Sequence, residues 1–271
     1  MRPLDMMICV KPVPDSRYWD RLSLDPKTKV LRREGIPVII SPLDKNAIEE
    51  ALRIKEARGG GKVVVISMGP PNTTEVLAMA YALGVDEAFL LSDRAFAGAD
   101  TLATACALAS GIKKVGNFDL ILFGNESLDG STGQVGPQVA EMLDMPSITR
   151  VEKVDFVDDE TMLVRSRIEG GYMVTEVKLP AALAVTKDLN LPRLAPVFGA
   201  LWATEKQTKV FTAAECSIAK ETIGLAGSPT YVPDVANIEM KRKGEVIKGE
   251  PGEIARQLVE KLRVAGVLPE A

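Results

Sequence analysis

The first 145 residues alternate short apolar runs with amphipathic segments. Five of these runs have the composition of buried strands, because they are short, rich in β-branched residues and bounded by polar or turn residues. They lie at 6–10, 37–40, 62–67, 88–92 and 119–124.

Helical patterns fill the intervals between the runs. We predict a helix with Asp44 as its N-cap and a second helix that Asn72 caps and Gly84 ends. A third helix should start at Asp100 and a fourth near Gly133. Strands alternating with helices predict an α/β fold in which helices cover both faces of a parallel sheet, giving three layers. Ligands bind such sheets beyond the C-terminal ends of the strands, so we expect five strand ends to form a cradle there.

The pattern changes after residue 146. Residues 147–187 alternate apolar and polar positions with two turns, which predicts an antiparallel hairpin extension that ends in a buried run at 181–186. Residues 196–271 are irregular apart from a predicted helix at 253–265. We therefore predict an α/β domain at 1–195 and a C-terminal arm at 196–271, which docks on its own domain or on a partner.

Composition narrows the possible functions. The net charge of −4 and the pI near 5.2 argue against a nucleic-acid-binding protein. The sequence has neither an apolar run long enough for a membrane span nor a secretory signal, so we expect a cytoplasmic protein. Histidine is absent and the three cysteines are scattered, which removes histidine-based triads and the usual zinc sites. We expect no catalytic side chain and no metal ligand, and the chemistry should belong to something the protein binds.

The most informative stretch is DLILFGNESLDGSTGQVGPQVAE, a predicted strand, a glycine-rich loop and a helix. Backbone N–H groups at a helix start, together with the helix dipole, can bind phosphate, and glycines allow a close approach. On glycine spacing alone, a plain turn with a capped helix remains the alternative. No GKS or GKT follows the loop, and no GxGxxG follows the first strand, so neither common phosphate motif is present.

Other strand ends add candidates. Cys9 and Lys11 close the first predicted strand, Ser41 and Asp44 follow the second, and Met68 follows the third. Core packing is the alternative for Cys9 and Met68, and capping is the alternative for Asp44. The loop from Asp93 to Thr101 is polar and points to the same end of the sheet. Its alternative reading is a loop that ends in a capped helix.

At these residues the sequence resembles the β subunit of the electron-transferring flavoproteins over nearly its whole length. The segments that carry the resemblance are ICVKPVPD, SPLDKNAIEEALRIKE, SMGPP, GNESLDGSTGQVG, EGGYMVTEVKLPAALAVT and LNLPR. The resemblance implies a three-layer adenine-nucleotide-binding fold related to nucleotide hydrolases and universal stress proteins (HUP-like). It also implies that 1–195 binds the nucleotide or FAD and that the arm 196–271 contacts an α-subunit partner. The FAD of that α subunit passes electrons to an FAD-dependent dehydrogenase of the acyl-CoA or lactate type.

The family has two branches that differ in the β-subunit ligand, which is structural AMP in one and a second, bifurcating FAD in the other. SDRAFAGADTLAT (92–104) and GLAGSPT (224–230) resemble the bifurcating branch. The resemblance therefore favours FAD over AMP, NADH as electron donor, and electron delivery both to the α-subunit FAD and to ferredoxin. The residues implied in cofactor binding are Cys9, Ser41, Asp44, Met68, Asp93, Asp100, Thr101, Thr104, Gly124, Asn125, Glu126, Ser127, Asp129, Gly130, Ser131, Thr132, Gly133, Gln134 and Val135.

The sequence also departs from the family pattern. Asn125-Glu126 stand where a basic residue and glutamine are common, and Ser41 stands where asparagine is usual. The segment 194–207 departs from the lysine-rich form of the family's partner-recognition loop. Its Trp202, Phe198 and Leu201 indicate either an apolar partner contact or core burial. Two other classes remain as rivals, a stress-protein-like ATP-binding module and an adenylating enzyme. KPVPDS (11–16) lacks the glycines of the adenylating signature.

Overall fold

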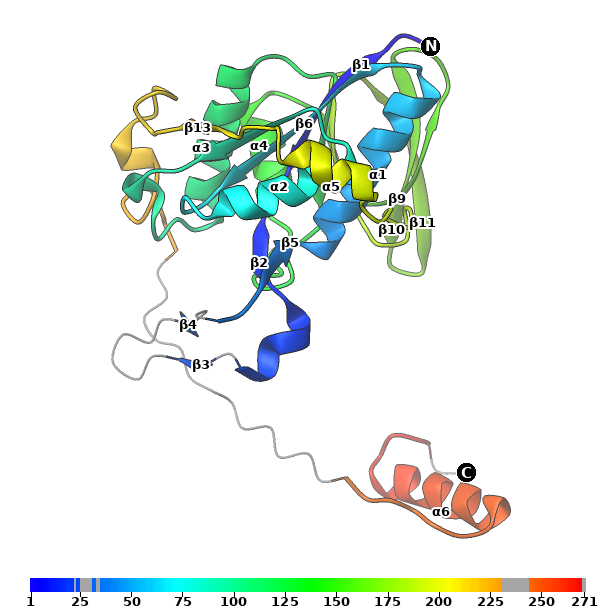
Figure 1. Cartoon of the computed structure of the whole chain (residues 1–271). Helices are drawn as coiled ribbons and strands as arrows, with labels where there is room; N and C mark the ends of the chain where they lie inside the picture. The colour runs from blue at the N-terminus through cyan, green and yellow to red at the C-terminus, as the bar shows by residue number, and fades with distance from the viewer. Residues whose placement is uncertain (22, 25–30, 33–34, 231–243, 270–271) are drawn as a thin grey trace. The chain divides into compact units, whose positions relative to one another are not determined.

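The computed structural model describes residues 1–21, 23–24, 31–32, 35–230 and 244–269. Contacts group Met1–Pro233 into one compact unit and Asp234–Ala271 into another. The first unit is built on one large sheet with helices on both sides (Figure 1).

Most of this sheet is parallel. Seven neighbouring strands, in the spatial order β9, β12, β8, β1, β6, β7 and β13, run parallel to one another. On the other side of β9, strands β10 and β11 pair antiparallel and form the hairpin extension. This confirms the predicted α/β class with its hairpin. In spatial order the strands are β11 (Gly171–Lys178), β10 (Thr161–Ile168), β9 (Ser147–Phe156), β12 (Ala181–Val185), β8 (Leu120–Gly124), β1 (Leu4–Cys9), β6 (Gly61–Met68), β7 (Glu87–Leu91) and β13 (Lys209–Phe211).

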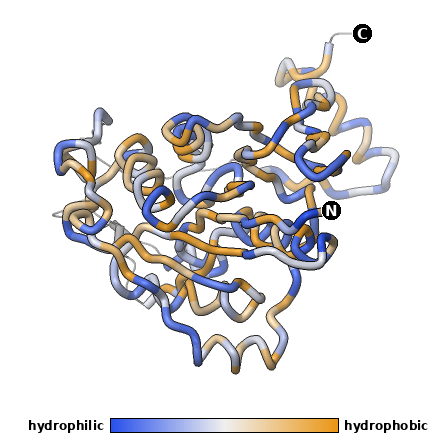
Figure 2. The backbone as a smooth tube through the Cα atoms, turned by 90° about the horizontal axis from the view of Figure 1, so that it is seen from above, coloured by the Kyte–Doolittle hydropathy of each residue, from blue (hydrophilic) through white to orange (hydrophobic). Residues whose placement is uncertain are grey.

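Alternate residues along the strands divide the core into two layers. One layer packs Met6 and Ile8 of β1 against α1 (Pro42–Ala57) and α2 (Thr73–Leu83). The other packs Met7 of β1 against α3 (Thr101–Val115) and α4 (Val135–Met142). The strands are apolar on both faces because each face is covered, and Figure 2 shows them as largely hydrophobic runs. The predicted three-layer arrangement is therefore confirmed.

One predicted strand has a different place. Residues Val38–Ile40 (β5) form a strand, but it pairs antiparallel with β2 (Pro12–Pro14), outside the large sheet. The expectation that it is one of five parallel strands is wrong, because a three-residue run is too short to reveal its partner. A second two-stranded sheet pairs β3 (Ser23–Leu24) with β4 (Leu31–Arg32).

Helix ends follow the predicted signals in part. Gly84 ends α2 with φ of 114° and Asp100 caps α3, as predicted. Asn72 precedes α2, but its side chain makes no capping hydrogen bond. Asp44 is not the cap of α1, because Ser41 takes that position and Pro42 begins the helix.

The first part of the predicted arm packs on the sheet domain. β13 extends the sheet beside β7, and α5 (Val197–Ala203) lies against α2. Gly199 makes this approach possible, since a Cβ there would stand 2.2 Å from the carbonyl oxygen of Ala82. Short 3-10 turns lie at Ser16–Arg21, Arg94–Phe96 and Lys220–Thr222. The functional division of the chain at residue 195 stays a prediction.

The second unit contains α6 (Pro251–Val264), close to the predicted helix. Lys261 reaches back to Glu245, whose carboxylate accepts a hydrogen bond from its ammonium group at 2.9 Å.

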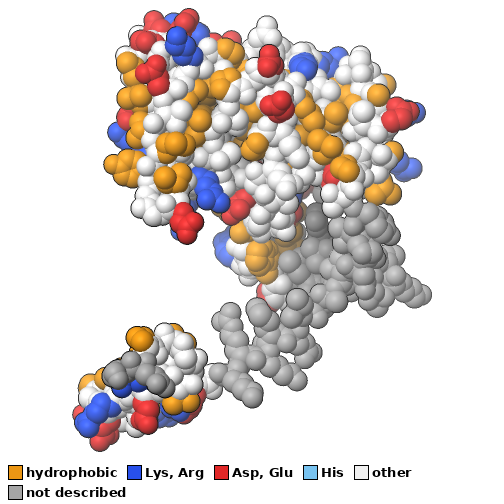
Figure 3. Space-filling view, turned by 180° about the vertical axis from the view of Figure 1, so that it is seen from behind, with side chains coloured by type: hydrophobic (Ala, Val, Ile, Leu, Met, Phe, Trp, Pro, Cys, Tyr) orange, Lys and Arg blue, Asp and Glu red, His pale blue; other side chains and the backbone are white. Residues whose placement is uncertain are grey.

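Among the described residues, every helix is too short or too polar to cross a membrane. On the face drawn in Figure 3, charged side chains of both signs are scattered and build no extended basic patch.

Candidate functional site

A cavity of about 390 Å³ opens at the C-terminal ends of β1, β6 and β8, beside the first turns of α3 and α4. This is the end of the sheet where parallel α/β proteins bind ligands. Most of the predicted residues line it: Cys9, Asp44, Met68, Asp100, Thr101, Thr104, Gly124, Asn125, Glu126, Ser127, Gly130, Thr132, Gly133, Gln134 and Val135.

The inner wall of the cavity is apolar. Cys9 ends β1 and pairs with Phe123 of the neighbouring strand β8, Met68 ends β6, and Leu108 comes from α3. Burial raises the pKa of the Cys9 thiol well above its usual value, and the nearby Asp44 carboxylate adds to this, so the thiol stays neutral. Such a wall suits the flat face of an aromatic ring system better than a charged group.

The glycine-rich loop forms the outer wall. Ser131 and Gly133 take positive φ angles of 47° and 63°, which turn the chain back toward the sheet before α4 begins at Val135. Pro137 falls in the first turn of α4, where a missing N–H costs nothing. Gln134, the N-cap, places no side-chain oxygen on that turn, and its Oε1 instead accepts the Thr101 hydroxyl at 2.9 Å. The first N–H groups of α4 therefore stay available for an anion.

Asp44 has a more specific role than a cap. Its carboxylate is buried and accepts two backbone N–H groups, that of Lys11 at 2.7 Å and that of Gly124 at 3.1 Å. Burial raises the pKa of Asp44 to about 7, although both hydrogen bonds and the Lys11 charge act in the opposite direction. The carboxyl group thus lies under the cavity and joins the ends of β1 and β8.

Lys11 connects this base to the loop above it. Its ammonium group lies 2.6 Å from Oδ1 of Asp129 and 3.2 Å from the Ser127 hydroxyl, which also accepts the N–H of Gly130 at 3.3 Å. These bonds lower the pKa of Asp129, whose own desolvation works against them. Lys11 is also the only cation that lines the cavity among the described residues, so most hydrogen-bond donors there are hydroxyl and backbone groups.

The loop before α3 is held by a distant part of the chain. Asp100 caps α3 by accepting the N–H of Ala103, and its other oxygen accepts the N–H of Thr230, both at 3.0 Å. The Ser228 hydroxyl accepts the N–H of Asp100 at 2.8 Å, and Leu225 N donates to the Ala97 carbonyl. The segments 92–104 and 224–230 are therefore bonded together at the edge of the cavity.

Four predicted binding residues do not line this cavity. Ser41 is fully buried behind it, and its hydroxyl has no hydrogen-bond partner among the residues that the structure describes. Asp93 accepts the N–H groups of Ala95 and Ala213, and these bonds lower its pKa and hold the chain near β13. Asp129 acts through Lys11. Ser131 faces a neighbouring polar cavity beside the hairpin.

Other lining residues lie outside the predicted set. Leu108 follows Thr101 and Thr104 at helical spacing, so the period of α3 could have found it. The sequence places Lys11 beside Cys9 at the end of the first strand, but the predicted cofactor-binding set does not include it. A position inside an apolar strand, such as Phe123, has no sequence signal that separates a cavity-lining residue from a core residue. The lining residues not predicted are Val10, Lys11, Ala99, Leu108, Phe123 and Gly136.

Comparison with known proteins gives a consistent family. The sequence model of the electron transfer flavoprotein domain matches residues 28–216. An electron transfer flavoprotein subunit beta of Thermoanaerobacterium thermosaccharolyticum is 44% identical over 98% of this chain and 100% of its own. The caffeyl-CoA reductase-Etf complex subunit CarD of Acetobacterium woodii is 44% identical over 95% of this chain and 97% of its own. Protein FixA of Azotobacter vinelandii is 37% identical over 94% of this chain and 93% of its own.

Proposed function

The chain belongs to the electron transfer flavoprotein family, among its β subunits, and from this premise we propose that its strand-end cavity holds an FAD that takes part in electron bifurcation. The observation that carries the proposal is the contact between 92–104 and 224–230. Each segment resembles the bifurcating branch, and Asp100, Ser228 and Thr230 bond them together beside the cavity. The two segments that resemble the bifurcating branch therefore meet beside one cavity, although they are far apart in the sequence.

The residues present suit the ADP part of FAD. The apolar wall at Cys9, Met68 and Phe123 fits an adenine ring, while the first turn of α4 and the hydroxyls of Thr101 and Ser127 fit the pyrophosphate. Lys11 adds one positive charge. The first turn of α3 is a weaker anion site, because Asp100 already caps it.

When bound, the flavin would supply the redox chemistry, accepting hydride from NADH and passing electrons to the α-subunit FAD and to ferredoxin. The protein's contribution is to bind and orient. Asp44 and Lys11 fix the loop around the nucleotide, and the apolar wall keeps water from one side of it.

We also propose a contact surface for a partner. β subunits of this family pair with α subunits, and the name of the Acetobacterium woodii relative includes a reductase in its complex. Six large apolar side chains stand exposed between β12 and β13 up to the end of α5, and we assign them to the dehydrogenase. They are Leu191, Leu194, Val197, Phe198, Leu201 and Trp202, of which Leu194 is 92% and Phe198 84% exposed.

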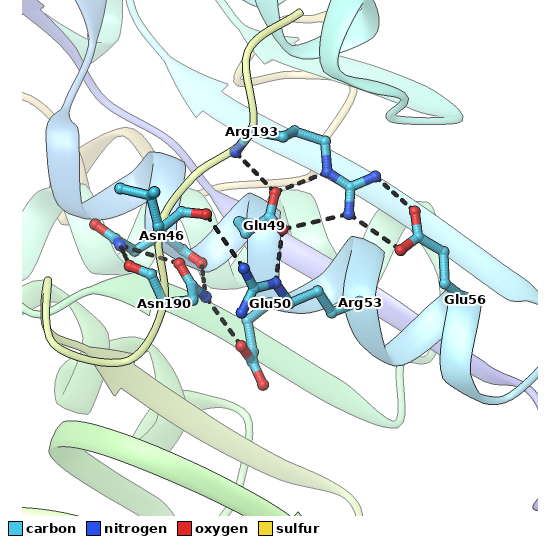
Figure 4. A network of polar contacts seen from close by, with 8 residues as sticks. Asn46, Glu49, Glu50, Arg53, Glu56, Asn190 and Arg193 are labelled. Atoms are coloured by element: carbon cyan, nitrogen blue, oxygen red, sulfur yellow. Dashed lines mark hydrogen bonds and ion pairs between the residues drawn. The ribbon is translucent and has the colours of Figure 1, made fainter.

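A polar network holds the start of this segment against α1 (Figure 4). The Glu49 carboxylate accepts the backbone N–H of Arg193 at 3.0 Å and its guanidinium at 2.7 Å. Asn46 and Asn190 each donate to the other's backbone carbonyl. Because this segment is already held in place, it loses less conformational entropy when a partner binds, which favours a protein contact there.

The test is the cofactor content of the αβ heterodimer purified from its native source. We expect two FAD molecules per heterodimer by mass spectrometry, and flavin reduction by NADH alone. One FAD together with one AMP would refute the bifurcating function and leave a structural nucleotide in the cavity. A colourless chain that purifies with ATP and without an α subunit would refute the redox role altogether.

A further inference from the structure

Asp44 continues the connection between two strands beyond the point where their backbone pairing stops. The β1–β8 ladder ends at the pair Cys9 and Phe123. The next free N–H groups, those of Lys11 and Gly124, both donate to the one carboxylate of Asp44. The Lys11 carbonyl accepts the N–H of Ser41, so both backbone groups of Lys11 are held by the start of α1. The width of the gap between these strand ends is therefore set by α1.

Gly124 belongs to the same arrangement. A Cβ at Gly124 would stand 2.4 Å from Oδ1 of Asp44 and 2.8 Å from its backbone nitrogen, closer than real contacts allow. Its φ angle is not in the left-handed region, so the lack of a side chain matters here for space. Gly124, which the sequence predicts as a strand end and a cofactor-binding residue, is thus required to be a glycine by the carboxylate of α1.

The connection extends outward through Lys11. Its side chain bonds Asp129 and Ser127, which lie on the loop around the cavity. We propose that Asp44 is a positioning residue of the nucleotide site, whose ionised carboxylate fixes Lys11 and Gly124 and thereby sets the position of loop 125–134. This inference rests on the proposed function, because it assumes that the cavity binds a nucleotide.

The arrangement makes a pH dependence measurable. Burial brings the pKa of Asp44 to about 7; Lys11 lowers this pKa and Asp129 raises it. The other ionisable group facing it from β1, the Cys9 thiol, stays neutral in this range. Protonation places a hydrogen on one oxygen that now accepts an N–H, so it should weaken one of the two bonds. Nucleotide affinity should then rise as the pH rises through about 7.

The experiment is calorimetric titration of the full chain, alone and paired with its α subunit, with ADP-ribose, whose pyrophosphate does not titrate near neutral pH. For the wild-type chain we expect about tenfold tighter binding at about pH 8 than at about pH 6. Asp44→Asn should bind at least about tenfold more weakly at the higher pH and show little pH dependence. Gly124→Ala, which displaces the carboxylate without removing it, should lose affinity similarly.

Asp119→Asn is the matched control, because Asp119 accepts the N–H of Asp5 at 2.9 Å and joins the same two strands at their opposite ends. It should keep both the affinity and its pH dependence. The inference is overturned if Asp44→Asn retains wild-type affinity and slope, or if Asp119→Asn loses both equally. A wild-type chain that binds no ADP-ribose at any pH would overturn the proposed function as well, so the two failures are distinguishable.

Discussion

The Asp100 carboxylate accepts the backbone N–H of Thr230 at 3.0 Å, across 130 residues of sequence. Ser228 strengthens this contact, because its hydroxyl accepts the N–H of Asp100 and donates to the Gly224 carbonyl at 2.7 Å. We expect Ser228→Ala to lower the free energy of unfolding by about 1 kcal/mol and to speed loss of the FAD that we propose for the cavity of this chain. Flavin release from the heterodimer measures this, with the α-subunit FAD as internal reference. Thr222→Ala, which removes a local hydroxyl bond in the same region, should leave the release rate unchanged.

The pair of Lys11 and Asp129 should matter for binding more than for stability. Lys11 is half exposed, and exposed ion pairs contribute less than about 1 kcal/mol. We expect Lys11→Met to leave the melting temperature nearly unchanged and to weaken nucleotide binding several-fold. The control is Lys153→Met, which breaks an exposed pair of the same 2.6 Å length on the hairpin. Equal affinities in the two variants would contradict a role for Lys11 at the loop.

Within the polar network on α1, we expect substitution of Glu49 to cause the largest loss in the free energy of unfolding. Desolvation would raise its pKa, but the hydrogen bonds from Arg193 and Arg53 outweigh this and hold the pKa below its usual value. Glu49 is buried, so Glu49→Gln should lower the free energy of unfolding by about 2–4 kcal/mol in urea denaturation. Arg53 is half exposed, and Arg53→Gln should cost less than about 1 kcal/mol. Similar losses in both variants would show that burial does not decide the cost.

Asp44 should also give the fold a distinct pH dependence. Its folded pKa of about 7 lies above the ordinary value, so the folded chain keeps this proton more tightly than the unfolded chain. The resulting stability is complete below about pH 4 and is lost as the pH rises through about 7, by about 2–4 kcal/mol in all. Urea denaturation of wild type and Asp44→Asn across this range isolates the effect. A constant difference between them would show that Asp44 titrates normally.

The exposed apolar segment should affect only the partner reaction. We expect Phe198→Ser together with Leu201→Ser to raise the KM for the co-purifying dehydrogenase at least about tenfold, since buried aromatic anchors dominate interfaces. The kcat, the flavin content and the melting temperature should stay unchanged, because both side chains are exposed in this chain. Val246→Ser, another exposed apolar position in the second unit, serves as the control. A fall in flavin content would mean that the segment supports the fold instead.

Periodicity was sufficient for the large elements of the fold. Strands such as Gly61–Met68 and helices such as Thr101–Val115 lie within a few residues of the predicted ranges, because each combines a clear pattern with a clear end signal. The predicted place of β5 in the parallel sheet was wrong, since a strand of three residues carries no information about its neighbour. β13 was missed for a related reason: it is three residues long and its partner β7 lies far away in sequence.

The site residues were predicted best where residues that are adjacent in the sequence are also adjacent in the cavity wall. Gly124 to Gln134 form one continuous loop, so the sequence contains most of that wall. Asp44 was assigned as a cap because Asp commonly has that role, and its true partners are backbone groups of Lys11 and Gly124, which no side-chain pattern reveals. Asp93 sits at the correct end of the sheet, but its oxygens are already used by Ala95 and Ala213.

The bond between Asp100 and Thr230 also imposes an order of assembly during synthesis. β1, β6, β7 and β8 all lie before residue 125, so the centre of the sheet can form while the chain is still emerging from the ribosome. Thr230 is translated more than a hundred residues after Asp100. The edge of the cavity therefore closes late, and a cofactor that needs this edge can be retained only once the chain has been made as far as Thr230.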